Sequence, residues 1–150
     1  MSPLRFTFAL TTNEGPPNFV AANVAGAELN VPLVAARLLP HAAPAKLTGS
    51  FFSLNAGNVV ITTFKPSADG TPDHYTLRLQ EVAGQATSVD IATPLQVSEA
   101  AHTSLTEDVI VRPIPVPLKV DLRAHETLTL RLTIPHKSKT RSNRWWEWEQ

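Results

Sequence analysis

Cysteine is absent from the 150 residues of this chain. Without it the chain can form neither disulfide bonds nor zinc sites that rely on thiolate ligands. Stability must therefore come from a hydrophobic core. The length is sufficient for one, because a compact domain of this size buries about 68–70% of the surface that its unfolded chain exposes. We expect one globular domain rather than several.

A net charge and long hydrophobic runs are also missing. Thirteen basic side chains balance thirteen acidic ones, so no overall positive field attracts nucleic acid. No apolar run approaches the roughly 20 residues of a membrane-spanning helix. The N-terminal sequence MSPLRFTFALTT lacks the long apolar segment of a signal peptide. We therefore expect a cytoplasmic protein, with no nucleic acid and no membrane among its partners.

The dominant pattern that is present is an alternation of apolar and polar residues with a period of two. It is clearest in residues 4–11, 118–123 and 127–134, the last of which read TLTLRLTI. This pattern is typical of β-strands that bury one face and expose the other. Further strands are predicted over residues 31–39, 50–54, 59–64, 75–82, 88–92, 97–103 and 109–111.

A sustained helical period is missing, and the nearest candidate, LVAARLL at residues 33–39, is short. Turn sequences such as NEGPPN, NAGN and VAGQ separate the expected strands. Many short strands divided by turns predict an all-β fold. We expect an antiparallel β-sandwich over residues 4–134, followed by a short irregular C-terminal tail over residues 135–150.

The segment RPIPVPL, residues 112–118, alternates proline with other residues. Proline has no N–H to donate to a strand ladder, so the segment should be an edge strand or a polyproline connector. A proline-rich ligand for another domain is the alternative.

No pattern in the sequence indicates a catalytic centre. The adjacent carboxylates Glu107 and Asp108 would point to opposite faces of a strand. A G-x-S-x-G motif and a phosphate-binding glycine loop are both missing. We therefore predict no catalytic residue, no metal ligand and no cofactor in this chain, and enzymatic activity is left undecided. A sandwich could still bring together distant histidines, which are His41, His74, His102, His125 and His136.

The C-terminal tail has an unusual composition. All three tryptophans, Trp145, Trp146 and Trp148, lie in the sequence WWEWEQ that ends the chain, after four basic residues. Indole rings stack on sugars or bases, and arginine attracts anions. Alternatively, the indoles pack against the sandwich or a neighbouring chain, because exposing them to water is unfavourable. We name these tryptophans and Arg78 as candidate carbohydrate-binding or partner-binding residues.

Residues 59–81, VVITTFKPSADGTPDHYTLRLQE, should form a β-hairpin. Lys65 and Pro66 end the apolar first strand. In the turn that follows, Asp69 can accept a hydrogen bond from the backbone and Gly70 can adopt positive φ. Lys65 or Asp69 could also contribute to an interface with another domain. The second strand should alternate: a buried face holds Tyr75, Leu77 and Leu79, and a face towards water or a partner holds Thr76 and Arg78.

The order of these pieces resembles the C-terminal β-domain of glycoside hydrolase family 38 α-mannosidases. In those enzymes a strand of the type NVVLTALKPAEDG turns into LRLYE, and a glycine turn and a strand rich in valine and threonine follow. The corresponding pieces here are NVVITTFKPSADG at residues 58–70, LRLQE at residues 77–81, Gly84 and residues 87–91. The resemblance extends over about residues 4–134. It departs from the family at Gln80, where an aromatic residue is usual.

The resemblance implies a module without catalytic residues of its own. The family's zinc site and its aspartate nucleophile lie in a large N-terminal catalytic domain that has no counterpart in these residues. Our first hypothesis is an accessory module in mannose metabolism, structural or carbohydrate-binding, whose partner is a glycan or a separate α-mannosidase catalytic chain. The second is a self-associating interaction protein, a homo-oligomer that uses edge strands and the tryptophan-rich tail. The third is an independent hydrolase with an unrecognised site.

Overall fold

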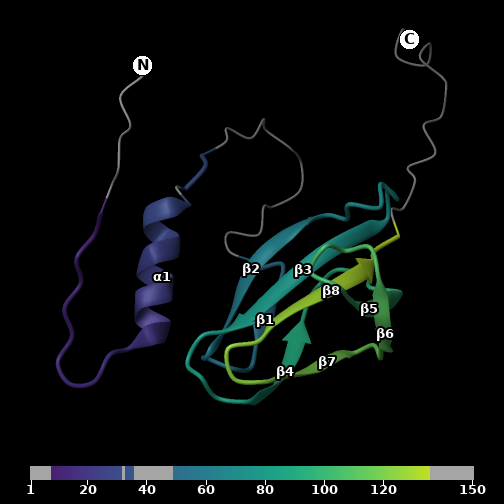
Figure 1. The fold of residues 1–150 in the computed structure, drawn as a ribbon. Helices are drawn as coiled ribbons and strands as arrows, with labels where there is room; N and C mark the ends of the chain where they lie inside the picture. Colours follow the sequence, from purple (N-terminus) through teal and green to yellow (C-terminus); the bar gives the residue numbers. More distant parts are fainter. Residues whose placement is uncertain (1–7, 32, 36–48, 136–150) are drawn as a thin grey trace, which may run out of the picture.

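The computed structural model describes residues 8–31, 33–35 and 49–135, which form one α-helix and a β-sandwich (Figure 1). Both sheets are antiparallel, so the predicted fold class is confirmed. The larger sheet has the strand order β2-β3-β8-β5-β6, and the smaller has β1-β4-β7. The elements are α1 (Phe19–Asn30), β1 (Ser53–Leu54), β2 (Val59–Pro66), β3 (His74–Glu81), β4 (Thr87–Ala92), β5 (Glu99–Thr103), β6 (Ile110–Ile114), β7 (Leu118–Leu122) and β8 (Thr127–Thr133).

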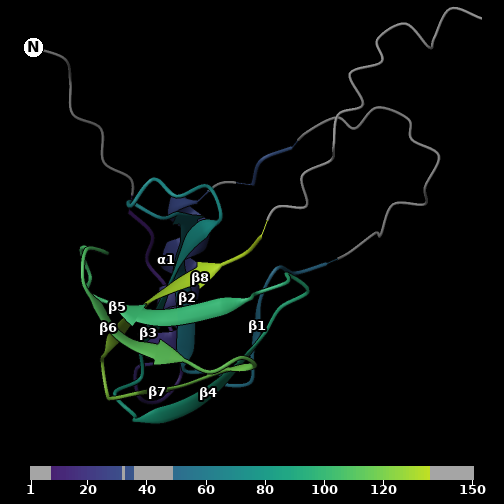
Figure 2. The same cartoon turned by 90° about the vertical axis from the view of Figure 1, so that its right-hand side faces the viewer.

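The hydrophobic core lies between the two sheets, which Figure 2 shows as separate layers. Leucines from β3 and β8 meet branched aliphatic side chains from β4 and β7 there. Fully burying one such side chain contributes roughly 1.5–3 kcal/mol relative to leaving it in water, so these four strands carry most of the hydrophobic stabilisation. The core residues are Val59, Leu77, Leu79, Val89, Ile91, Ala100, Ile114, Leu118, Val120, Leu122, Leu128, Leu130 and Leu132.

The alternation of buried and exposed residues differs between strands. In β7 it follows the prediction, because Leu118, Val120 and Leu122 are buried and the residues between them are exposed. In β3 and β8 it fails, since Thr76 and Thr129 are buried although they lie on the face opposite the core. The expectation that Thr76 faces water or a partner is therefore wrong. The loop between β5 and β6 covers Thr76, whose hydroxyl donates a hydrogen bond to Glu107 of that loop.

The proline-rich segment begins as an edge strand. β6 is the outer strand of the larger sheet, and its Pro113 stands opposite Ala101 of β5. An edge strand needs hydrogen bonds on one side only, so it tolerates a residue without an N–H. The edge-strand form of the prediction is confirmed for residues 112–114 of the segment.

The helix α1 contradicts the expectation that the chain has no helix. Asn18 caps its N-terminus, because the side-chain oxygen accepts a hydrogen bond from the backbone N–H of Ala21 at 3.0 Å. The helix shows no amphipathic period because it buries none of its residues, so no single face had to be apolar. None of the helices in the described ranges is long and apolar enough to cross a membrane.

Two of the expected strands do not form in their described parts. Residues 8–11 of the strand expected over 4–11, and residues 31 and 33–35 of the strand expected over 31–39, lie outside any strand. Alternation becomes a strand only where a neighbour supplies hydrogen-bond partners, and no strand in the described part of the chain pairs with these residues. Their other residues, and residues 136–150 of the tail, lie outside the described residues. The domain limits 4–134 and 135–150 stay predictions.

Candidate functional site

A buried carboxylate, Glu107, lies on the outer face of the larger sheet. It belongs to the loop between β5 and β6, which Ser104 closes by accepting a hydrogen bond from the Glu107 backbone N–H at 3.0 Å. The backbone of Glu107 has φ of 70°, a left-handed conformation that costs a residue other than glycine of order 1–3 kcal/mol. The contacts of the Glu107 side chain must therefore offset the cost of this backbone conformation.

Those contacts come from hydrogen-bond donors on β2, on β3 and in the turn between them. Lys65 lies 2.8 Å from Oε1, and the hydroxyl of Thr76 and the backbone N–H of Ala68 donate to Oε2 at 2.8 and 2.9 Å. Burial raises the pKa of Glu107, but the bonds from Lys65, Ala68 and Thr76 outweigh it and hold the pKa below its usual range. The carboxylate therefore ties the loop to the sheet in its ionised form.

Arg78, one of the residues named from the sequence, takes part in the same arrangement. Its Nη2 donates to the carbonyl of Leu105 at 2.9 Å, and its Nε donates to the hydroxyl of Thr129 at 3.3 Å. The guanidinium is also 3.7 Å from Glu107 and keeps 23% of its side-chain surface exposed. Arg78 thus binds a loop of its own chain, and its role towards a sugar or a partner stays a prediction.

The turn between β2 and β3 confirms the hairpin. Asp69 accepts a hydrogen bond from the backbone N–H of Thr71 at 3.0 Å, and Gly70 has φ of 73°. The second Asp69 oxygen lies 2.6 Å from Nδ1 of His74 and 3.4 Å from Arg131 on β8. The bond to His74, together with the Thr71 N–H and the charges of His74 and Arg131, lowers the pKa of Asp69. These contacts stabilise one end of the sandwich.

A second buried carboxylate, Glu81, stabilises the other end. It accepts hydrogen bonds from the backbone N–H groups of Ala83, Gly84 and His125 at 2.8, 2.8 and 2.9 Å, and from the side chain of Asn58 at 2.9 Å. Burial raises its pKa, but these four bonds prevail and lower the pKa to about 2. Two turns are therefore held by one side chain.

An aromatic shelf lies at the Asp69 end of the sandwich. Phe64 faces the same side of the sheet as the buried Leu77 opposite it, yet it is 40% exposed. The smaller sheet ends on this side with β1, which has two residues, so Phe64 is left partly uncovered. The shelf lines an open hollow of about 250 Å³. Its lining residues are Phe51, Phe64, Tyr75, Leu95, Ile134 and Pro135.

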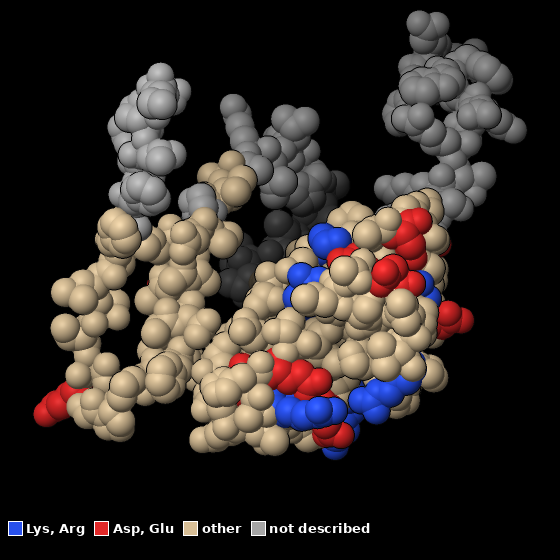
Figure 3. All heavy atoms as spheres, in the orientation of Figure 1, with Lys and Arg blue, Asp and Glu red and all other residues tan. Residues whose placement is uncertain are grey.

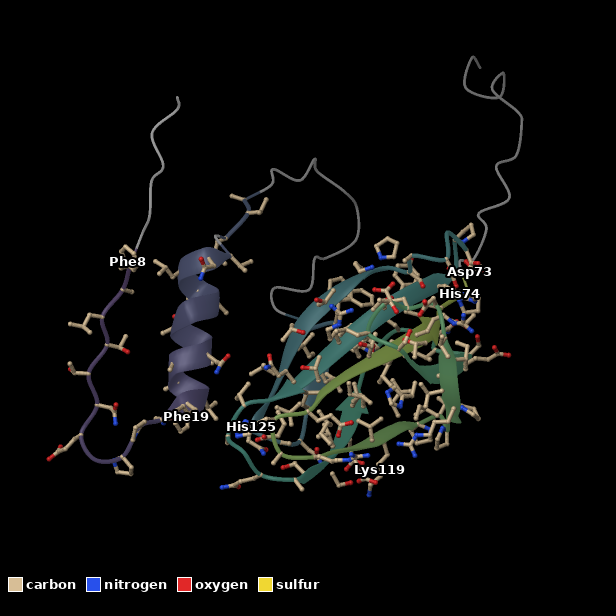
Figure 4. All side chains as sticks on the ribbon, in the orientation of Figure 1. Phe8, Phe19, Asp73, His74, Lys119 and His125 are labelled. Atoms are coloured by element: carbon tan, nitrogen blue, oxygen red, sulfur yellow. The ribbon has the colours of Figure 1, made fainter. Side chains whose placement is uncertain are left out.

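The N-terminal arm, which we define as residues 8–31 and 33–35, is the most exposed apolar part of the described chain. Figure 4 shows Phe8 and Phe19 on it, beside the sandwich. A hollow of about 720 Å³ separates α1 from β2, with Phe19, Val24 and Val31 on one side and Val60 and Ile61 on the other. Charged side chains gather on the sandwich instead, as Figure 3 shows for one face.

Metal-ligating groups do not gather in the described ranges. His74 belongs to the Asp69 cluster, whereas His125 lies at the opposite end of the sheet (Figure 4). No group of three or more histidine, cysteine, aspartate or glutamate residues is arranged there as metal ligands. His41 and His136 lie outside the described residues.

A comparison with family models identifies the fold. Residues 58–130 match the model described as the glycosyl hydrolases family 38 C-terminal beta sandwich domain. This part of the chain belongs to that family. The match begins just before β2 and ends within β8, so it contains the two buried carboxylates and most of the core. No catalytic domain is evident in the 150 residues. The curated proteins gave no match.

The family 38 domain accounts for the hairpin and the core, but not for the residues named from the sequence as binding sites. Trp145, Trp146 and Trp148 lie outside the described residues, and their role stays a prediction. Sequence reasoning missed the buried roles of Glu81 and Glu107, and it considered Glu107 only as one of two adjacent carboxylates. Glu81 carried a signal, because it continues the inward phase of Leu77 and Leu79, where a carboxylate must be buried and hydrogen-bonded.

Proposed function

We propose that this chain is a non-catalytic accessory module that docks on a separate polypeptide carrying a family 38 catalytic domain. The observation that carries the proposal is the N-terminal arm. Apart from the half-buried Val20, every large hydrophobic side chain on it that the structure describes is exposed. These residues are Phe8, Leu10, Phe19, Val24, Leu29, Val31, Leu33 and Val34.

The helix α1 has no packed apolar face in the described structure. Helices shorter than about 12–15 residues are marginal in water by themselves, and most gain their stability from packing an apolar face. α1 has 12 residues and buries none of them. Leu10 and Leu33 on either side of it are 93% and 102% exposed. Contiguous apolar surface of this kind is typical of a protein-binding site.

The charge of the arm also supports a protein partner. Its described residues include two charged side chains, Glu14 and Glu28, and an interface core is depleted of charge in this way. A nucleic acid would instead require basic residues. The partner we propose is the α-mannosidase catalytic chain, because the family domain found here accompanies such a chain in the enzymes that it resembles.

Co-purification tests the proposal. The chain is co-expressed with the α-mannosidase catalytic chain encoded nearest to it, and the amount of complex is measured after affinity capture. We expect a complex with the native chain, and a loss of at least tenfold in affinity with Phe19→Asp or Leu33→Asp, since a charge buried in an interface costs well over 1.4 kcal/mol. Val111→Asp is the matched control, because Val111 is 57% exposed on β6. Equal binding by all three variants would refute the docking surface.

Self-association is the second candidate, and one observation favours it. β2 is an edge strand of eight residues, and its Ile61 is 37% exposed. An apolar edge strand with unpaired backbone groups is a template for pairing with another strand. Light scattering on the purified chain separates the two candidates. A stable dimer that Thr62→Pro abolishes would favour pairing through β2, whereas a monomer would favour the accessory module.

A further inference from the structure

The aromatic shelf lies where the chain leaves the sandwich. Pro135, the last described residue, is one of its walls. The backbone N–H of Ile134 donates to the carbonyl of Asp73 at 2.8 Å, which fixes the end of β8 against the β2–β3 turn. Figure 4 shows Asp73 and His74 at this end of the sandwich. The described part of the chain therefore ends at the shelf.

The hollow on the shelf is suited to an aromatic ring. An apolar cavity of about 150 Å³ accepts benzene, so a hollow of about 250 Å³ has room for an indole. Phe64 and Tyr75 already stack, with ring centroids 5.6 Å apart, and Phe52 meets Phe64 edge-on at 4.9 Å. A further ring would extend this packing in a geometry that aromatic side chains favour.

The lining of the hollow favours an apolar occupant over a sugar. Tyr75 is the one lining residue with a polar side-chain group. A sugar would have to bury several hydroxyls with few hydrogen-bond partners, which is unfavourable. An indole has a single N–H to satisfy.

The C-terminal segment is long enough to return to the hollow. Ten residues lead from Pro135 to Trp145, and they can span roughly 33–36 Å when extended. A short tether gives a binding group an effective concentration in the millimolar range. Charge also favours the contact, since residues 136–150 hold four basic and two acidic side chains and the remainder of the neutral chain is net negative.

We propose that the aromatic shelf is the docking site of the chain's own C-terminal segment, residues 136–150, with the indole of Trp145, Trp146 or Trp148 seated in the hollow. The docked indole completes the core at the end where the smaller sheet leaves Phe64 partly uncovered. Phe51, which is 67% exposed, becomes part of the wall around it. This inference concerns a different surface from the N-terminal arm, so it stands or fails independently of the proposed function.

The chain contains its own reporter for this contact. It has one tyrosine, Tyr75 on the shelf, and its three tryptophans all lie in the segment proposed to dock. Excitation energy passes from tyrosine to a nearby tryptophan, so docking quenches the emission of Tyr75. The reference without acceptors is the full-length chain with Trp145→Phe, Trp146→Phe and Trp148→Phe. We expect Tyr75 to emit severalfold less in the native chain than in this reference.

Two matched phenylalanine variants locate the contact. Phe51→Ser removes an exposed wall of the hollow and should restore most of the Tyr75 emission, measured against the same background without tryptophans. Phe19→Ser removes a similarly exposed ring from α1, where Phe19 is 58% exposed, and should leave the quenching unchanged. Far-UV circular dichroism confirms that each variant keeps the sandwich.

Four results would overturn the proposal. Tyr75 could emit equally in the native chain and the tryptophan-free reference. The quenching could weaken on dilution, which would mean that the segment docks on a second copy. It could survive Phe51→Ser and disappear in Phe19→Ser, which would place the contact on α1. Finally, Tyr75 could be unquenched in the native chain and respond to added mannotriose, in which case the occupant of the hollow is a sugar.

Discussion

Glu107→Gln tests whether the loop between β5 and β6 is held by a carboxylate. Each group that Glu107 contacts in the described structure is a donor, including Lys65, the Thr76 hydroxyl and the Ala68 N–H. A glutamine has almost the same shape, but its amide nitrogen is a donor too. The amide nitrogen of the glutamine would therefore face other donors and could not accept their hydrogen bonds, and the negative charge opposite Lys65 would be lost.

The expected cost follows from these contacts. Hydrogen bonds to a charged group contribute about 1.5–3 kcal/mol, and leaving a buried partner unsatisfied adds a desolvation penalty. Lys65 keeps 42% of its side-chain surface in water, so its share is discounted. We expect Glu107→Gln to lower the free energy of unfolding by about 2–4 kcal/mol.

Urea denaturation followed by circular dichroism measures the loss. With a slope of about 1–3 kcal/mol per molar urea, the midpoint should fall by roughly 1–2 M. Glu99→Gln is the control, because Glu99 is exposed on β5 and should change stability by less than about 0.5 kcal/mol. Equal midpoints for the two variants would refute the idea that Glu107 ties the loop to the sheet.

Three further predictions concern other parts of the sandwich. The Glu81 pKa of about 2 lies below its ordinary value of 4.5, so ionised Glu81 stabilises the fold fully above about pH 4.5, and this stabilisation is lost as the pH falls through about 2. Between these pH values, the urea midpoint should therefore fall less steeply with falling pH in Glu81→Gln than in the native chain. Leu77→Ala should lower the free energy of unfolding by about 2–5 kcal/mol because Leu77 is fully buried, whereas Arg78→Ala should lower it by about 1–2 kcal/mol through the loss of hydrogen bonds. Denaturant melts that show Arg78→Ala to be the more destabilising would contradict the register of β3. Both Gly84 and Gly70 have positive φ, but a Cβ on Gly84 would lie 2.9 Å from the ring of His125, whereas a Cβ on Gly70 would meet open space. Thermal melts should therefore show Gly84→Ala to be more destabilising than Gly70→Ala by about 1–3 kcal/mol, and equal melting temperatures would count against the clash with His125.

Strand positions could be predicted from the sequence because the core is one-sided there. The periods of two in residues 118–123 and 127–134 predict the positions of β7 and β8, although the strict alternation of burial holds only in β7. The glycine-containing turn predicts the β2–β3 hairpin. The prediction was weakest where burial comes from something other than the opposite sheet. Thr76 is polar and in the outward phase, so only the loop that folds back over it makes it buried.

The helix and the buried carboxylates were not predicted from the sequence, for related reasons. α1 buries no residue, so its sequence contains no apolar stripe from which a helical period could be read. Glu107 was noticed only as one of two adjacent carboxylates, because nothing local shows that its donors lie in the β2–β3 hairpin, about 30 to 40 positions earlier in the chain. Contacts between residues so far apart in the chain depend on the topology of the sheet, which cannot be read from a single sequence.

The order of strands in the larger sheet has a consequence for synthesis of the chain. β8 lies between β3 and β5 in the sheet but follows both in the sequence. While the chain emerges from the ribosome, the β2–β3 and β5–β6 hairpins therefore have no shared neighbour until residues 127–133 arrive. An isolated two-stranded hairpin is at best marginally stable in water. Folding of the sandwich must wait for its last strand, and a nascent chain that stalls before β8 would expose two unpaired strand edges to its neighbours on a polysome.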